Sequence, residues 1–150
     1  MCSILARGVG PVYAVHEDAH ALVMLPRYVR SWGTAMVIPK PHVTTYAEID
    51  PQLWVHVNTL ALHTARVVER VQQPRRCYVA SIGSSADEQE LVQSSRHLHV
   101  HVIPVHDASM RPADVFSWTE GVLVADASEW EQLCASYRAA WTSSGAPAGS

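Results

Sequence analysis

Three histidines alternate with apolar residues in the segment His97-Leu98-His99-Val100-His101. Alternate side chains of a β-strand point to opposite faces, so the spacing predicts three imidazoles on one face and apolar residues on the other. At a rise of about 3.3 Å per residue, neighbouring histidines would lie roughly 6–7 Å apart. A neutral imidazole is a nucleophile, and a second imidazole beside it can donate a hydrogen bond to a phosphate oxygen. The row therefore predicts nucleophilic chemistry at an anionic group.

Two other interpretations fit a histidine row. It can be the solvated polar face of a sheet, although three of the nine histidines within five residues are more than that requires. It can also be a metal site, because two histidines placed two residues apart on a strand can chelate zinc, copper or iron. The spacing alone leaves these alternatives open.

Apolar runs bounded by turn residues predict the strands that must position the row. The row itself is expected in a strand over Arg96–Ile103 that ends at Pro104. The four other predicted strands are a hairpin of Val12–His16 and Ala21–Leu25, then Ala35–Pro39, and later Cys77–Ile82.

Two helices are predicted as well. Asp50 as N-cap and Pro51 at the first helical position open a long helix that reaches about Gln72. Ser128-Glu129-Trp130-Glu131 is interpreted as a capping box that opens a second helix. The apolar face of this second helix comprises Trp130, Leu133, Cys134, Tyr137 and Trp141. The order of elements predicts an α+β domain, an antiparallel sheet covered by helices.

The segment His97–Ile103 resembles the signature of the histidine-triad (HIT) superfamily, in which three histidines alternate with apolar residues and two further apolar residues follow. Val37-Ile38-Pro39-Lys40-Pro41-His42 is similar to the family's apolar-Pro-Lys-x-His segment. Tyr13–Asp18 resembles the start of its first hairpin, and Gln93-Ser94 matches a pair found three residues before the triad. The resemblance covers about residues 2–104 and is of the divergent bacterial type.

This resemblance implies a HIT-like fold: a five-stranded antiparallel sheet with a long crossover helix and a C-terminal helix, often paired as a homodimer. It also implies a nucleotide hydrolase or nucleotidyl transferase acting at an α-phosphorus. The substrate would be a nucleoside phosphoramidate, a nucleotidyl-acyl compound or a dinucleoside polyphosphate. His99 would attack the phosphorus and form a covalent nucleotidyl-histidine, which water then hydrolyses.

The resemblance further assigns roles to individual residues. The catalytic group is His99 with its neighbours His97 and His101, of which His97 would orient His99 through its backbone carbonyl. The phosphate would be contacted by His42, Gln93 and Ser94. The base and ribose would lie in an apolar cleft near Val15, Leu22, Met24 and Trp32.

The chain departs from the family pattern at several positions. Pro26 stands where some branches carry a ribose-binding Asp or Asn, and Ser81 stands where the family has Asn. The zinc-binding Cys-x-x-Cys of some bacterial members is reduced to Cys2-Ser3-Ile4-Leu5, which argues against a family-type zinc site. We therefore expect no metal site and no cofactor requirement. The departures leave open an alternative function, a nucleotide-binding module with weak or vestigial catalysis.

Length, charge and composition limit the number of domains, the kinds of partner and the compartment that we expect. A length of 150 residues predicts one domain over residues 1–150, with a divergent part over 105–142 and a tail over 143–150. The net charge of −3 argues against a nucleic acid polymer as partner. No apolar run approaches the roughly 20 residues of a membrane span. Three widely spaced cysteines fit a reducing cytoplasm.

Overall fold

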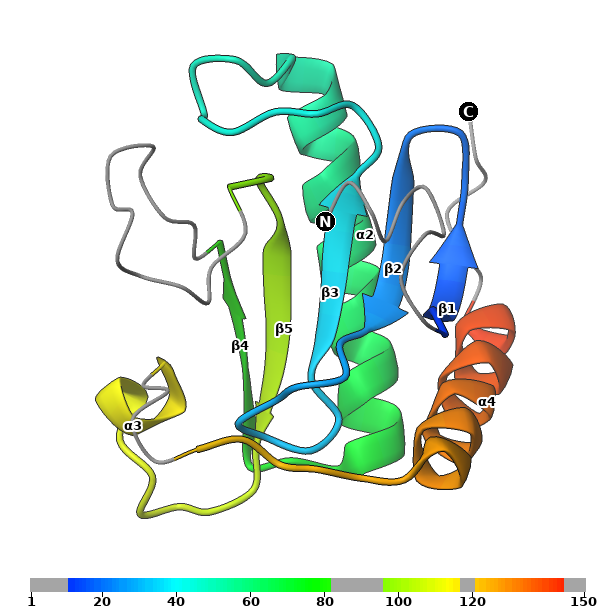
Figure 1. The fold of residues 1–150 in the computed structure, drawn as a ribbon, viewed down its shortest axis with the longest axis vertical. Coiled ribbons are helices and arrows are strands. Elements are labelled where there is room, and N and C mark those ends of the chain that lie inside the picture. The colour runs from blue at the N-terminus through cyan, green and yellow to red at the C-terminus, as the bar shows by residue number, and fades with distance from the viewer. Residues whose placement is uncertain (1–10, 82–95, 117–120, 145–150) are drawn as a thin grey trace.

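Five strands form one antiparallel sheet in the order β1-β2-β3-β5-β4 (Figure 1). The structure is a computed structural model and describes residues 11–81, 96–116 and 121–144. The strands are β1 (Tyr13–Glu17), β2 (Ala21–Leu25), β3 (Ala35–Pro39), β4 (Arg76–Ala80) and β5 (Val100–Val105). Every neighbouring pair is antiparallel. The predicted α+β architecture with a five-stranded antiparallel sheet is confirmed.

The histidine strand differs from its prediction. The predicted strand spans Arg96–Ile103, but β5 begins at Val100 and continues through Pro104 to Val105. His97 and His99 therefore precede the strand. Pro104 pairs with Cys77 of β4 on one side of β5. On the other side the ladder with β3 ends at Val102, so no described strand residue on that side requires the N–H that proline lacks. The Pro104 carbonyl instead accepts a hydrogen bond from the hydroxyl of Ser31, in the loop before β3.

Helix α2 (Pro51–Gln72) is the predicted crossover between β3 and β4. The Asp50 side chain accepts hydrogen bonds from the backbone N–H groups of Gln52 and Leu53 and so caps the helix. At the other end, Gln73 adopts a left-handed conformation with φ of 47°, and its N–H bonds the Glu69 carbonyl. Both ends of the helix are thus satisfied by local groups.

Helix α4 (Ala127–Ser143) is the predicted C-terminal helix, but the predicted capping residues are wrong. The capping box consists of Asp126 and Glu129, since Asp126 accepts from the Glu129 N–H and Glu129 accepts from the Asp126 N–H. The predicted apolar face is confirmed, because all five of its residues are buried. The two capping patterns overlap in the sequence, and the observed one starts the helix two residues earlier.

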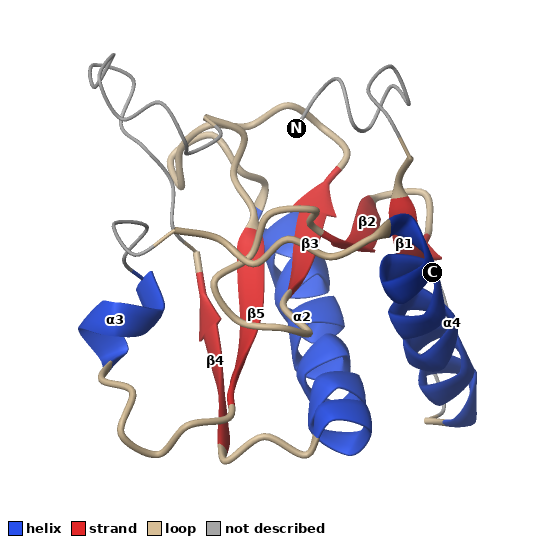
Figure 2. Cartoon of the chain, turned by 60° about the horizontal axis from the view of Figure 1, so that its bottom comes forward, coloured by secondary structure: helices blue, strands red, loops and turns tan. Residues whose placement is uncertain are grey.

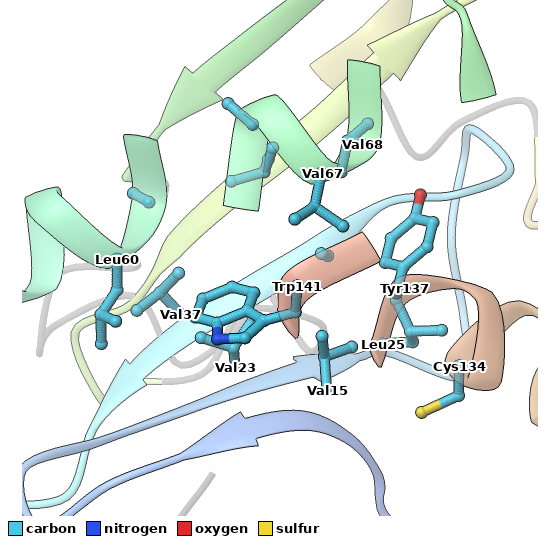
Figure 3. Close-up of a cluster of buried hydrophobic side chains, with 14 of the residues drawn as sticks. Val15, Val23, Leu25, Val37, Leu60, Val67, Val68, Cys134, Tyr137 and Trp141 are labelled. Carbon is cyan, nitrogen blue, oxygen red and sulfur yellow. The ribbon is translucent and has the colours of Figure 1, made fainter. Parts of the chain in front are cut away.

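Both long helices cover the same face of the sheet (Figures 1 and 2). Their apolar side chains meet those of the strands in one large core (Figure 3). Val67 of α2 and Tyr137 of α4 are fully buried there, with Val37 of β3. A short helix, α3 (Pro112–Phe116), packs through Val115 against Ile103 and Val105 of β5 in a separate cluster.

Candidate active site

The loop that follows β3 holds the histidine segment just before β5 begins. The N–H of Leu98 donates to the carbonyl of Val43 at 2.8 Å. The Leu98 side chain packs with Val43 and Ile49 in a small cluster of buried apolar residues. The backbone at Leu98 is therefore fixed by this loop rather than by a strand ladder.

His97 is tied to the end of β3. Its Nε2 lies 2.7 Å from the carbonyl oxygen of Pro39. Because a carbonyl only accepts, Nε2 must carry the proton that is donated. The ring is 2% exposed and meets the His42 ring edge-on, with 5.2 Å between centroids. The structure thus brings His42 beside His97.

His99 is held through both of its ring nitrogens. Its Nδ1 lies 2.7 Å from the backbone carbonyl of His97, so Nδ1 carries the proton. Its Nε2 is then unprotonated and can accept a hydrogen bond, and this nitrogen lies 2.9 Å from Nε2 of His101. His101 must therefore donate from Nε2. The backbone arrangement selects the tautomer of His99 in which Nε2 is the basic, nucleophilic atom.

Burial lowers the pKa of all three imidazoles. For His97 and His99, hydrogen bonds to backbone carbonyls act in the opposite direction without cancelling the effect of burial on the pKa. For His101, burial and the neighbouring His99 together lower the pKa to about 4. Desolvation penalises an imidazolium, so the row is uncharged at neutral pH.

An apolar floor lies beside the histidines on the sheet face opposite the long helices. Met36 of β3 pairs with His101 on one side and with Met24 of β2 on the other, so the three side chains share a face. Leu22 pairs with Ile38 one step closer to His99. Leu22, Met24, Met36 and Ile38 form one buried cluster. Met36 and Ile38 are not among the residues predicted for the nucleoside cleft. The alternation of side chains along Ala35–Pro39 could have indicated that both share one face.

The structure does not bring Val15 and Trp32 to this floor. Val15 lies in the large core beneath the helices. The Trp32 ring packs on Trp130 of α4, with centroids 4.8 Å apart. Trp32 also precedes β3, whereas His97 contacts the residue that ends β3. The predicted nucleoside residues therefore divide between two faces, with Leu22 and Met24 on the face of His101.

Gln93 and Ser94 lie outside the described residues. In the part of the chain that the structure describes, no group of three or more His, Cys, Asp or Glu side chains is arranged to hold a metal ion. Nor does any helix over those residues have the length and apolar character needed to cross a membrane.

Comparison with known proteins agrees with this geometry. Residues 7–108 match the family described as HIT domain. An uncharacterised HIT-like protein of Mycoplasma genitalium is 27% identical over 96 residues, which are 63% of this chain. The match spans 64% of the length of that relative.

Solved structures show the same fold. A hypothetical histidine triad nucleotide-binding protein of Sulfolobus tokodaii superposes with a TM-score of 0.75 and 26% identity, covering 95% of this chain and 91% of that one. A zinc-bound histidine triad family protein of Mycobacterium smegmatis superposes with a TM-score of 0.70 and 22% identity, over 95% and 91% of the two chains. With the triad in place on this fold and most of the chain matched, the protein belongs to the HIT domain family.

Proposed function

We propose that the protein is a nucleotide hydrolase or nucleotidyl transferase that acts at an α-phosphorus through a covalent nucleotidyl-His99. The substrate is a nucleoside phosphoramidate, a nucleotidyl-acyl compound or a dinucleoside polyphosphate. One observation carries the proposal: the Nδ1–H of His99 bonds the His97 carbonyl, which leaves a nucleophilic lone pair on Nε2. Family membership supports the reaction class.

The reaction balances with the chain's own groups. Nε2 of His99 forms a bond to phosphorus while the bond to the leaving group breaks, and the leaving group takes its proton from water. Water then attacks the phosphorus, the electrons of the N–P bond return to Nε2, and a proton passes to solvent. The Nδ1–H bond to the His97 carbonyl persists and stabilises the cationic ring of the intermediate.

His101 acts as a hydrogen-bond donor in this proposal. Its pKa of about 4 keeps it neutral at pH 7, so it has no labile second proton to give to the leaving group. Its Nε2–H now faces the lone pair of His99. When phosphorus approaches that lone pair, the N–H turns to a phosphate oxygen and stabilises the developing charge. His42, beside His97, together with Gln93 and Ser94, complete the phosphate contacts.

The direct test is detection of the adduct. Incubation with an adenosine phosphoramidate labelled at phosphorus, denaturation and mass spectrometry should locate the nucleotidyl group on His99. His99→Ala should lose several orders of magnitude in kcat, as removal of a nucleophile does. His106→Ala is the matched control, because His106 is exposed and contacts the Trp32 carbonyl at the far end of β5. Full activity in His99→Ala would contradict the proposal.

The proposed chemistry requires no bound metal. The His97 carbonyl holds the proton of His99 on Nδ1, and His101 donates to the unprotonated Nε2, so no metal ion is needed to select this tautomer. We expect turnover to survive dialysis against a chelator unchanged. Loss of activity on chelation, restored by zinc, would instead favour a metalloenzyme that uses the histidine row.

A nucleotide-binding module is the second candidate. The apolar floor supports it, because Leu22, Met24, Met36 and Ile38 are each at most 4% exposed. A base would reach residues this deeply buried only after a rearrangement of the protein, which would slow turnover. Micromolar nucleotide binding by calorimetry, with no adduct from any of the three substrate classes, would favour this candidate.

We further propose a homodimer in the cytoplasm. Within the described residues β4 pairs only with β5, and its Val79 side chain is 48% exposed. An open strand edge with an apolar side chain is a surface that a second copy can cover. Sedimentation equilibrium measures the state directly, and a monomer at micromolar concentration would contradict the proposal.

A further inference from the structure

Ser81 contacts the backbone of the residue proposed as nucleophile. Its hydroxyl donates to the carbonyl oxygen of His99 at 2.8 Å, in a partly buried position. Ser81 directly follows β4, and His99 directly precedes β5. The bond therefore joins the end of β4 to the start of β5, next to the candidate active site.

This bond stands where the sheet ladder stops. The pairing of β4 with β5 ends at Ala80 and His101. The pairing of β3 with β5 ends at Val37 and Val100. The His99 carbonyl thus lies beyond both ladders, in a residue that is 3% exposed. A backbone carbonyl in such a place needs a donor, and the Ser81 side chain supplies it.

We propose that Ser81 is a positioning residue for His99. Its hydroxyl fixes the His99 peptide group and so sets the direction in which the imidazole leaves the backbone. Two further hydrogen bonds, to the His97 carbonyl and to His101, fix the ring itself. Ser81 does not touch the reacting atoms in this account. The expected effect of Ser81 on the reaction rate rests on the proposed function, whereas its expected effect on the orientation of the His99 ring does not.

Kinetics provide the first test. Ser81→Ala should lower kcat about tenfold, a cost of about 1.4 kcal/mol in the barrier, while KM stays within twofold. Ser81→Thr keeps the hydroxyl and should recover at least half of wild-type kcat. Ser31→Ala is the matched control, because Ser31 donates in the same way to the carbonyl of Pro104, at the other end of β5. It should lower the melting temperature and leave kcat unchanged.

The outcomes separate the two proposals. If wild type forms the His99 adduct and Ser81→Ala turns over at the wild-type rate, the positioning role is wrong. The positioning role is also wrong if Ser31→Ala loses as much kcat as Ser81→Ala, because general loosening of the strand would then explain both. If wild type forms no adduct, the proposed function fails, and a second measurement decides the role of Ser81.

That second measurement is nuclear magnetic resonance of the histidine rings. Long-range proton–nitrogen spectra report which ring nitrogen carries the proton. In wild type and Ser81→Thr, His99 should be the Nδ1–H tautomer, whereas Ser81→Ala should shift both nitrogen signals toward a mixture of tautomers. The signals of His106 should not move. Unchanged His99 signals in a folded Ser81→Ala protein would overturn the inference whatever the activity.

Discussion

Acid should destabilise the fold through the histidine row, and His101 allows the size of the effect to be worked out. Its pKa is about 4 in the folded protein, against about 6.5 for an ordinary histidine. Each unit of difference between the two pKa values changes the free energy of unfolding by about 1.4 kcal/mol. Protonation of this side chain therefore lowers the free energy of unfolding by about 3 kcal/mol. The cause is burial of the ring, followed by the neighbouring His99.

The sign follows from proton uptake. Above pH 6.5 the ring is neutral in both states, and its full contribution to the free energy of unfolding is present. As the pH falls below 6.5 the unfolded chain binds a proton that the folded protein does not, so stability is lost until the pH reaches about 4. His97 and His99, whose pKa values are also lowered by burial, act in the same direction.

The assay is urea unfolding at half-unit steps from pH 4.5 to pH 8, for wild type and His101→Gln. Glutamine keeps a donor that can face His99 Nε2 but does not titrate. Between pH 4.5 and 6 the stability of the variant should fall less steeply with pH, by up to about 1.4 kcal/mol per pH unit. Between pH 7 and 8 the two curves should run parallel, which is the internal control. Equal slopes below pH 6 would refute the argument.

Three further predictions concern the frame around the site. Gly33→Ala should lose about 2–3 kcal/mol in urea unfolding, because φ is +89° and the new Cβ would lie 2.8 Å from the Gln72 Cγ; a loss under 0.5 kcal/mol would contradict the conformation. Tyr137→Phe should lose about 1–3 kcal/mol by calorimetry, because its hydroxyl donates to the Gly33 carbonyl at 2.6 Å in the core, and an unchanged melting temperature would mean that water replaces it. Asp50→Ala should lose about 1 kcal/mol by removing the α2 cap, and Asp126→Ala offers the same measurement at α4 for comparison.

Local patterns predict most of the fold. Asp50-Pro51 sets the start of α2 to the residue, because capping and proline geometry depend on neighbours alone. The first hairpin and β3 are equally clear from apolar runs between polar breaks. The predicted end of β5 is wrong because the surroundings that accommodate Pro104 include Ser31, which lies 73 residues away in sequence.

The geometry of the site is harder to predict from the sequence than the fold. Alternation indicates the face of histidines, but the contacts of His97 and Leu98 with Pro39 and Val43 depend on a loop whose path no local pattern gives. Val15 differs for another reason: alternation along β1 places it with Tyr13 in the large core, on the opposite face from Leu22 and Met24. The pairing of β1 with β2 shifts between Ala14 and His16, so a bulge interrupts the alternation of side chains after Val15. The same bulge turns His16 toward α4, where its ring stacks on Trp141 with centroids 4.6 Å apart.

The attachment of the histidine segment to the loop after β3 also bears on how the protein folds. His97 bonds a carbonyl 58 residues earlier in the chain, and the whole of α2 and β4 lies between them. The entropy of closing so long a loop must be paid before contacts between its ends stabilise the fold, whereas helix and hairpin contacts are local. The hairpin and α2 can therefore form before the histidines reach their final geometry. Pulsed hydrogen exchange during refolding, measured at the Leu98 amide that bonds Val43, would time when the histidine segment reaches its final geometry.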